Sequence, residues 1–483
     1  MTDKQTAAPA PKGSQTIQPP ADESPWKGVW RDVLGGGLVR SILAIVLALF
    51  LGSLLVVATS PDVQKTAGYF FARPGDFFNA AFGTIGGAYR AIWEGAVFNP
   101  KTGFKPLGQT LIWATPLITA GLGIALGFRA GLFNIGGRGQ MLIAALFTGF
   151  VGASWPLPYG IHLVVAILAG VVGGALWAGI VGVLKARTGA HEVILTIMLN
   201  FVALNLVTYL LKTPLFQADG AGGNAKSKPI LETAQMPDVL GPINISFVIA
   251  IAAAVLYWWL MDRSTVGFNI RAVGLNPSAA RTAGINVERT IVITLSLSGA
   301  FMGLAGVSQV LQRQAAGYDP GVDAGIGFDA ITVALLGANS PVGVVLAALL
   351  IGGLKAGSFQ LRVVESIPIE IVSIIQAIIV LLIAAPPLIR AIFRLPKPTG
   401  RTLLGRLRAA RELARTGTTA GAPVVAAPGA TAAMSSAGVA AVEAEQEGEA
   451  DLAEASGGGG APPSPSAKHP GSRSDSDSKG ASE

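Results

Sequence analysis

The sequence predicts an all-α integral membrane protein with about ten membrane segments, some of them broken or re-entrant, between disordered polar tails. Three observations support this class. Only 13% of the 483 residues are charged, whereas soluble domains carry about 25%. Hydrophobic residues make up 51% of the chain, and the mean hydropathy is +0.55. Many apolar runs reach the roughly 20 residues that a helix needs to cross a bilayer.

The elements follow from this pattern in chain order. Residues 1–30 are polar and rich in Pro, Ala and Gln, and they predict a disordered tail without the apolar core of a signal peptide. A membrane domain extends over residues 31–395. Residues 416–483, rich in Ala, Gly, Ser and Pro, predict a second disordered tail. The predicted spans are 38–60, 106–128, 132–153, 161–184, 192–211, 246–262 and 290–311, then a pair within 326–356 and a last span at 369–389.

Two segments of this domain depart from simple crossings. Residues 76–98 carry acidic and basic side chains among aromatic ones, a composition typical of a helix at the membrane interface. The region 326–356 holds Gly337, Asn339 and Pro341 near its middle. Interrupted helices survive at membrane depth only when protein buries them, so we expect two short crossings or a re-entrant pair here.

Lys and Arg residues in the short loops predict the orientation of the chain. The loop 263–289 contains four arginines, and eight bases lie from Arg390 to Arg415, a stretch that includes the basic segment 396–415. The loop 212–245 holds three bases and three acids. If the basic loops face the cytoplasm, both termini are cytoplasmic and the loop 212–245 is extracytoplasmic.

The chain shows no motif for chemistry of its own. It contains no G-x-x-x-x-G-K-[ST] sequence for ATP binding and no H-E-x-x-H sequence for zinc. It has no cysteine, and no spacing of His, Asp and Glu predicts a metal site. No basic folded module of the kind that binds nucleic acid is visible. We therefore expect no catalytic residue, no metal and no nucleic-acid partner; the surrounding partner is membrane lipid.

Polar side chains within the apolar spans predict a translocation route. Charged and amide groups that face lipid are costly, so they normally face a bundle interior or a watery path. Hydrogen bonding between helices is the alternative for the amides. For Glu192, which lies near a span end, contact with lipid headgroups is another alternative. The candidates for the path are Asn134, Gln140, Glu192, Asn200 and Asp329.

The glycines predict two features. In "FNIGGRGQ" three glycines in four positions favour a non-helical break, since each costs about 1 kcal/mol inside a helix. The backbone groups of such a break can bind a polar ligand. Small residues four apart elsewhere predict close helix packing, at Gly170 and Gly174, at Gly299 and Gly303, and at Gly353 and Gly357.

The loop 263–289 also predicts a helix of about two turns. Asn276 is a good N-cap, Pro277 suits the first helical position, and Gly284 can adopt the left-handed conformation that ends a helix. The alternative is that this helix is only a capped turn that links two spans. The loop is longer than a connector needs, which favours docking of a partner. The face offered to that partner would carry Ala279, Ala280 and Ala283.

The stretch "NPSAARTAGI" resembles the coupling-helix loop of ABC importer permeases, whose pattern is E-A-A, three residues, then G. Here Ala279–Ala280 and Gly284 keep that spacing, while Ser278 stands where the family often has Glu. The stretches "LFNIGGRGQMLIAAL", "HEVILTIMLN", "GFDAITVALLGANSPVG" and "IPIEIVSIIQAIIVLLIAA" add to the resemblance.

Together these motifs, over about 105–390, resemble the permeases of ribose, branched-chain amino acid and nucleoside importers. The simple-sugar and nucleoside permeases are the most similar subgroup. One departure is Arg138, where the family pattern leads us to expect an acidic residue.

The resemblance implies a multi-pass permease subunit in a bacterial inner membrane, with a path for a small polar solute such as a nucleoside or simple sugar. It implies a second permease subunit (the same or a homologous chain), cytoplasmic P-loop ATPase subunits and an extracytoplasmic solute-binding lipoprotein. No cofactor belongs to this chain, since the partner ATPase binds ATP and Mg²⁺. The residues implied to couple with the ATPase are Asn276, Pro277, Ala279, Ala280, Arg281, Gly284 and Ile285.

Two other functions remain open at this point. An ion-gradient-driven secondary transporter would use Asp329 or Glu192 as its proton or sodium site and would need no ATPase. A channel or passive scaffold is a weaker alternative.

Overall fold

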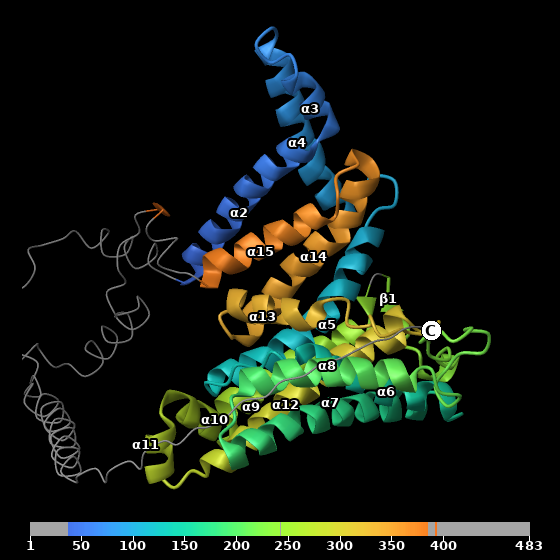
Figure 1. Ribbon diagram of the computed structural model, residues 1–483, viewed down its shortest axis with the longest axis vertical. Coiled ribbons are helices and arrows are strands. Elements are labelled where there is room, and N and C mark those ends of the chain that lie inside the picture. Colours follow the sequence, from blue (N-terminus) through green and yellow to red (C-terminus); the bar gives the residue numbers. More distant parts are fainter. Residues whose placement is uncertain (1–36, 242, 385–391, 394–483) are drawn as a thin grey trace, which may run out of the picture. The chain divides into compact units, whose positions relative to one another are not determined.

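The computed structural model describes residues 37–241, 243–384 and 392–393, and the predicted segments 1–30, 396–415 and 416–483 lie outside them. The described part is almost entirely helical (Figure 1). Its α-helices are α2 (Gly37–Thr59), α3 (Pro61–Ala67), α4 (Pro74–Ala96), α5 (Lys105–Arg129), α6 (Gly137–Ser154), α7 (Ile161–Thr188), α8 (Glu192–Leu210), α9 (Ile245–Arg263), α10 (Thr265–Leu275), α11 (Pro277–Thr282), α12 (Val287–Ser308), α13 (Ile326–Leu336), α14 (Pro341–Glu365) and α15 (Glu370–Ala384).

Each of the ten predicted membrane segments corresponds to a helix. Seven described helices are long and apolar enough to cross a membrane, namely α2, α5, α7, α8, α9, α12 and α14. The other three are shorter or more polar: α6 has 18 residues, α13 has 11 and α15 is described over 15. At 1.5 Å per residue α13 covers only about 17 Å, too little to span a bilayer. The predicted interruption of the pair is confirmed, since α13 ends at Leu336 and α14 begins at Pro341.

Helix α5 is the centre of the core. In its most apolar stretch 89% of the residues are buried, and it packs against α9, α12, α13 and α14. Beside it α7 and α12 approach closely through the predicted glycine pairs. A Cβ atom on Gly174 would collide with the backbone of Gly299 and Gly303, so a larger side chain here would push the helices apart.

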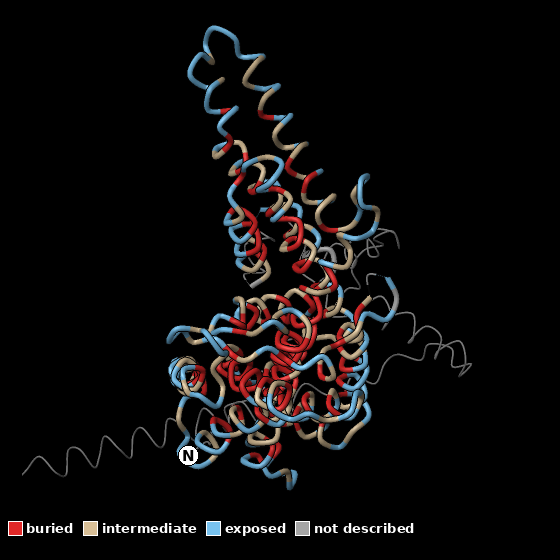
Figure 2. The backbone as a smooth tube through the Cα atoms, turned by 90° about the vertical axis from the view of Figure 1, so that its right-hand side faces the viewer, coloured by how far each residue is buried: buried red, intermediate tan, exposed pale blue. Residues whose placement is uncertain are grey.

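A second group of helices contains α2, α4, α14 and α15. Helix α4 packs along α14, and α2 packs along α15, so two helices from opposite ends of the sequence lie side by side (Figure 1). Figure 2 shows that the hairpin tip formed by α3 and the start of α4 is largely exposed. Helix α4 corresponds to the predicted interfacial segment 76–98, and its place at a membrane interface stays a prediction.

The two ends of the helix bundle carry different structures. Helices α10 and α11 lie at one end and the loop 212–245 lies at the other (Figure 1). This loop contains a 3₁₀ turn, η1 (Glu232–Ala234), and a two-stranded antiparallel hairpin, β1 (Asp238–Leu240) and β2 (Ile243–Asn244), a small exception to the all-α expectation. Its backbone N–H groups at Ile230 and Leu231 donate to Ala315 O (2.8 Å) and Gly152 O (2.9 Å). These bonds hold the loop against the end of the bundle.

Candidate translocation site and coupling helix

The backbone leaves the helical conformation between α5 and α6, at residues 130–136. The sequence placed this break on the glycines of "FNIGGRGQ", but Gly137 and Gly139 lie in the first turn of α6. They serve close contact instead: a Cβ atom on Gly139 would lie 2.9 Å from Asn200 Oδ1, and one on Gly137 would lie 3.0 Å from Gly327 O. The glycines thus let α8 and α13 approach the start of α6.

Buried amides hold this break in place. Asn134 Nδ2 donates to Ser298 Oγ at 2.9 Å, and Asn134 Oδ1 accepts from Gln140 Nε2 at 3.0 Å and from Gly136 N at 2.9 Å. Asn134 and Gln140 are each only 1% exposed. We call this set, with Asn200, the amide network.

Asn200 belongs to the same network from the side of α8. Its Oδ1 accepts from Gly139 N at 2.8 Å, and its Nδ2 donates to Ile135 O at 2.9 Å. Three of the five predicted path residues are therefore buried and hydrogen-bonded within the protein. This is the geometry of helix–helix hydrogen bonding, the alternative considered for these amides.

Glu192 makes a separate connection at the α11 end of the bundle. Lys185 Nζ lies 2.7 Å from Glu192 Oε2, and Phe133 N donates to Glu192 Oε1 at 3.4 Å. The carboxylate is buried and joins the end of α7, the start of α8 and the α5–α6 break. Its partner is thus a lysine of the same chain, not the lipid headgroups.

Asp329, the fifth candidate, lies among other charges. Its carboxylate pairs with Lys355 Nζ at 2.5 Å, and the two side chains are 25% and 19% exposed. Nearby on the start of α6, Arg138 Nε donates to Asp323 Oδ1 at 3.3 Å. Burial raises the pKa of the Asp323 carboxyl, and the Arg138 guanidinium partly opposes this rise.

Trp113 of α5 joins these pairs to a further cation. The guanidinium of Arg313, at the end of the π-helical turn η2 (Gln309–Arg313), lies 3.5 Å from the centre of the Trp113 ring. Lys355 Nζ lies 5.1 Å from the same ring, and Phe359 stacks at 6.4 Å with an interplanar angle of 25°. We define the charged cluster as Arg138, Arg313, Asp323, Asp329 and Lys355.

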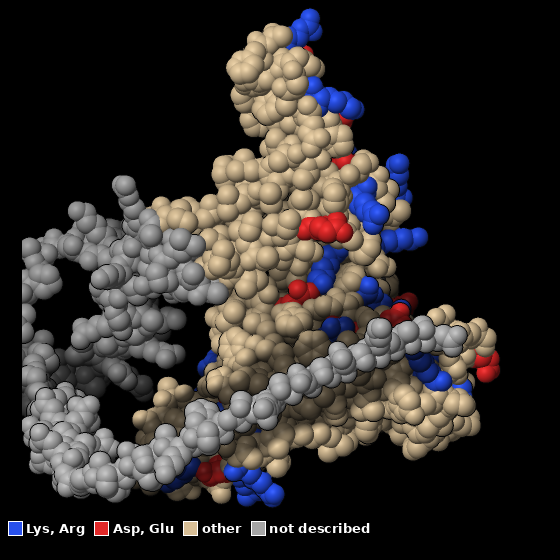
Figure 3. Space-filling view, in the orientation of Figure 1, with Lys and Arg blue, Asp and Glu red and all other residues tan. Residues whose placement is uncertain are grey.

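Figure 3 shows Lys, Arg, Asp and Glu side chains over the region of α5, α13 and α14, and further charges at the tip of the α3–α4 hairpin, along the right-hand side and beside α11. Sequence reasoning found only Asp329 of this cluster as a candidate and noted Arg138 as a departure from the family pattern. Lys355 could have been found, because a lysine stands in the middle of the apolar run that forms α14. Asp323 and Arg313 lie in irregular segments, which the span pattern does not locate.

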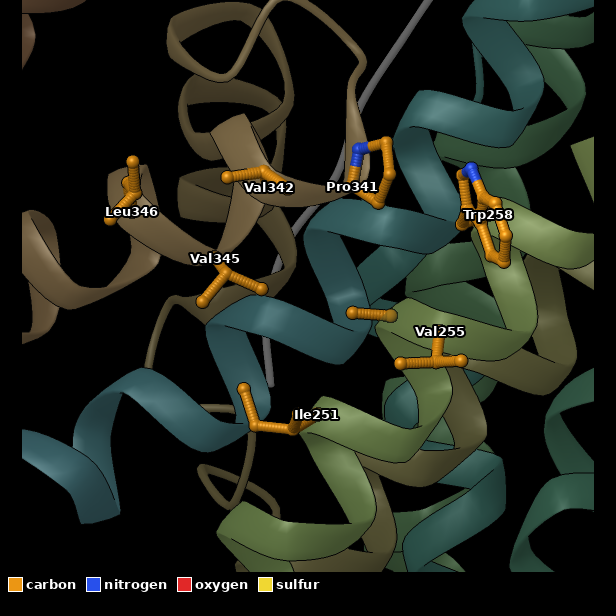
Figure 4. A pocket seen from close by; sticks show the side chains of 8 residues that line it. Ile251, Val255, Trp258, Pro341, Val342, Val345 and Leu346 are labelled. Carbon is orange, nitrogen blue, oxygen red and sulfur yellow. The ribbon is translucent and has the colours of Figure 1, made fainter. Parts of the chain in front are cut away.

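The apolar groove between α9 and α14 is a poor candidate for a polar solute. It has a volume of about 430 Å³, and side chains of the two helices face each other across it (Figure 4). Apart from the indole of Trp258, none of its lining side chains has a polar group. The lining residues are Ile251, Ala254, Val255, Trp258, Pro341, Val342, Val345 and Leu346.

The predicted short helix is confirmed as α11. Asn276 Oδ1 accepts from Ala279 N at 3.0 Å, as an N-cap does, and Pro277 is the first helical residue. Gly284 has φ +84°, and Ile285 N donates to Ala280 O at 3.0 Å, which closes the C-terminal end. The caps therefore limit the helix to the length that the sequence predicted.

The expected alanine face of α11 needs one correction. Ala280 is 4% exposed and packs against Val273 of α10 and Val287 of α12, so it faces the protein and not a partner. Ala279 and Ala283 remain exposed. Sequence reasoning missed Leu275, which ends α10 and is 88% exposed beside α11.

Arg281, the remaining residue of the predicted coupling set, lies on the surface of α11. It pairs with Glu288 at the start of α12, and the two side chains are 64% and 50% exposed. In the part of the chain that the structure describes, no group of three or more His, Asp and Glu side chains could hold a metal.

Comparison with known proteins finds a matching family and several similar relatives. The family described as "Branched-chain amino acid transport system / permease component" matches residues 107–384. The guanosine ABC transporter permease protein NupP of Bacillus subtilis is 35% identical over 365 residues, which cover 75% of this chain and 97% of the relative. No solved structure matches the chain.

Two further relatives are similar. The glucose ABC transporter permease protein TsgB13 of Haloferax volcanii is 36% identical over 290 residues, 57% of this chain and 75% of the relative. The nucleoside ABC transporter permease protein NupB of Lactococcus lactis is 35% identical over 327 residues, 64% of this chain and 87% of the relative.

Proposed function

The chain belongs to the branched-chain amino acid transport system / permease component family, and from this premise we propose that it imports a nucleoside or a simple sugar. As an ABC transporter permease subunit it is not itself catalytic. The relatives' names support the solute class, because two are named for guanosine or nucleosides and one for glucose.

The charged cluster is the part of the chain that we assign to the solute path. The single observation that carries this assignment is the partial exposure of the Asp329–Lys355 pair, which joins the mainly apolar helices α13 and α14. Such a pair is costly against lipid, so the surface around it faces water or a partner. The amide network shapes the wall beside it, with Asn134, Gln140 and Asn200 fixing the α5–α6 break, and Glu192 fixes the end of α8.

This placement also supports a second permease subunit, the same or a homologous chain. The cluster lies on an open face of one chain, and a second subunit across that face would exclude lipid from it. Cytoplasmic P-loop ATPase subunits that bind ATP and Mg²⁺, and an extracytoplasmic solute-binding lipoprotein, complete the proposed importer. We propose a bacterial inner membrane location with both termini and α11 in the cytoplasm, in line with the arginines of the loop 263–289.

Helix α11 has the form of a coupling element. Leu275, Ala279 and Ala283 offer a small apolar surface to the ATPase, while Asn276, Pro277 and Gly284 fix its shape. Ala280, packed between α10 and α12, with Ile285 beside it, passes a displacement of α11 to the spans. Arg281 lies on the exposed surface of α11 and pairs with Glu288 of α12.

The test is to co-express the chain with a candidate P-loop ATPase and a candidate binding lipoprotein from the same organism and to reconstitute the complex in liposomes. We expect ATP-dependent uptake of labelled guanosine or glucose. Leu275→Ser should lower co-purification of the ATPase about tenfold, because it removes the most exposed apolar side chain beside α11. Leu215→Ser, on a leucine that is 55% exposed in the loop at the other end of the bundle, is the matched control. If the Leu275→Ser variant retained as much ATPase as the control, the assignment of α11 as the coupling helix would be wrong.

A further inference from the structure

We propose that Arg313, supported by Trp113, is a stacking platform for a planar heteroaromatic ring, which makes the transported solute a nucleoside and not a simple sugar. This inference rests on the proposed function of the chain as an importer permease. It adds a residue pair that recognises the solute within the membrane domain, separate from any recognition by the binding lipoprotein.

The guanidinium of Arg313 lies close over the indole ring of Trp113. The guanidinium carbon of Arg313 lies 3.5 Å from the centre of the Trp113 ring, within contact distance for two stacked planes. Trp113 is held rigidly, since it is only 9% exposed within the central helix α5. One face of the guanidinium is therefore occupied by the indole, and the residue as a whole remains exposed.

Arg313 has few other partners. Among the described residues its side chain makes one hydrogen bond, a long one from Nη1 to Gln309 Oε1 at 3.5 Å, and no carboxylate lies within ion-pair distance of it. The other two cations of the charged cluster are each paired with an aspartate. Arg313 is thus the cation of this cluster whose N–H groups and outer face remain available for a solute.

The chemistry of this platform favours a nucleobase. Guanidinium planes stack on nucleobases as they stack on aromatic side chains, and the five N–H donors can bind ring nitrogens and carbonyl oxygens at the edge. A simple sugar has no π face, so it would gain hydrogen bonds but no stacking. With three cations and two carboxylates, the cluster also disfavours a cationic solute.

The neighbouring ion pair can bind the rest of a nucleoside. Lys355 Nζ lies 5.1 Å from the same indole ring and is paired with Asp329, so a donor and an acceptor stand beside the platform. Sugar hydroxyls both donate and accept hydrogen bonds, as such a pair requires. Ring stacking on Arg313 and hydroxyl contacts to the pair would orient the solute by two different groups.

The chain offers a matched control in a second Arg–Trp pair. Arg263 lies over the Trp258 ring at 5.8 Å, and Trp258 lines the apolar groove between α9 and α14, which has no charged lining residue. The residue types are the same, but the contact is looser and the surroundings suit lipid.

The experiment measures ATP-dependent uptake of labelled guanosine and labelled glucose by the reconstituted complex. Trp113→Ala and Arg313→Lys should each lower the maximal rate of guanosine uptake about tenfold, because Lys keeps the charge but not the plane. Trp258→Ala should stay within about twofold of the wild type. The solute concentration at half-maximal rate should change little, since the binding lipoprotein sets it. Size-exclusion profiles and co-purified ATPase check that each complex assembles.

Three outcomes separate the proposals. Wild-type guanosine uptake that survives both Trp113→Ala and Arg313→Lys would overturn the platform and leave the permease function intact. Uptake of glucose without guanosine would overturn the assignment of a nucleoside in the same way. Absence of ATP-dependent uptake of either solute by the wild-type complex would overturn the proposed function itself.

Discussion

The amide network and the charged cluster both place polar side chains within the membrane domain, yet they are built in opposite ways. In the amide network Asn134 and Gln140 are 1% exposed, and each bonds to groups of the same chain. In the charged cluster Asp329 and Lys355 are about a fifth to a quarter exposed, and among the described residues the Arg313 side chain makes a single long hydrogen bond. Buried and satisfied groups hold helices together, whereas partly exposed charges on an apolar face indicate a route for solute.

The largest expected effect tests the structural role of the amide network. Asn200→Leu leaves Gly139 N and Ile135 O without their partners, and each buried unsatisfied group costs about 1–3 kcal/mol. We expect a loss of about 3 kcal/mol in the free energy of unfolding, measured by denaturant titration of the purified chain in detergent. Uptake per folded complex should stay within about twofold of the wild type.

Asn205→Leu is the matched control for this change. Asn205 lies on the same helix and is exposed, and among the described residues its side chain donates only to Phe201 O of its own helix. It should leave stability unchanged. If Asn200→Leu proved as harmless as Asn205→Leu, or if it abolished uptake without affecting stability, the division between the two regions would be wrong.

The next effect tests the charged cluster. Lys355→Met leaves the Asp329 carboxylate without its ion pair, and we expect uptake to fall about tenfold, or about 1.4 kcal/mol in the rate-limiting step. Lys355→Met should also lower the stability of the chain, because it leaves a partly buried carboxylate unpaired. The double variant Asp329→Asn with Lys355→Met removes both charges, so it should restore stability but not uptake. Full recovery of uptake in the double variant would show that the pair is structural, like the amides.

A smaller effect concerns pH and the Arg138–Asp323 pair. The pKa of the Asp323 carboxyl is raised by burial, so its ionisation lowers stability as pH rises through that folded-state pKa, and Arg138 limits the loss. Arg138→Gln should therefore destabilise the chain more at pH 8 than at pH 4, by about 1 kcal/mol. Denaturant titrations at both pH values measure this. Combining the change with Asp323→Asn should abolish the pH difference, and a difference that persists would exclude Asp323 as its source.

The membrane spans could be predicted because apolar length depends on local sequence alone. The caps of α11 were equally local, since Asn276, Pro277 and Gly284 specify the ends of a helix without help from the rest of the chain. The interruption near Asn339 followed from residue types that do not continue a helix. These features required no knowledge of which helices pack together.

The charged cluster could not be predicted in this way, because it is assembled from five separate segments. Arg138 and Asp323 are 185 positions apart in the chain, and their contact depends on how α6 and the segment before α13 pack. The same limit explains Ala280, whose burial depends on Val273 and Val287 and not on its place in the helix pattern. Periodicity identified its neighbours on α11 but not the face that the rest of the chain covers.

The smallest expected effect concerns the exposed ion pair Arg281–Glu288, which we compare with the Lys355–Asp329 pair of the charged cluster. The charged atoms of Arg281 and Glu288 are as close as those of Lys355 and Asp329. However, the Arg281 side chain is 64% exposed and that of Glu288 is 50% exposed, so water screens their attraction. We expect Arg281→Gln to leave the unfolding midpoint of the isolated chain in detergent unchanged, whereas Lys355→Met lowers it. Equal destabilisation by the two variants would mean that exposure does not separate the pairs, and the charged cluster would lose the property by which we assign it to the solute path.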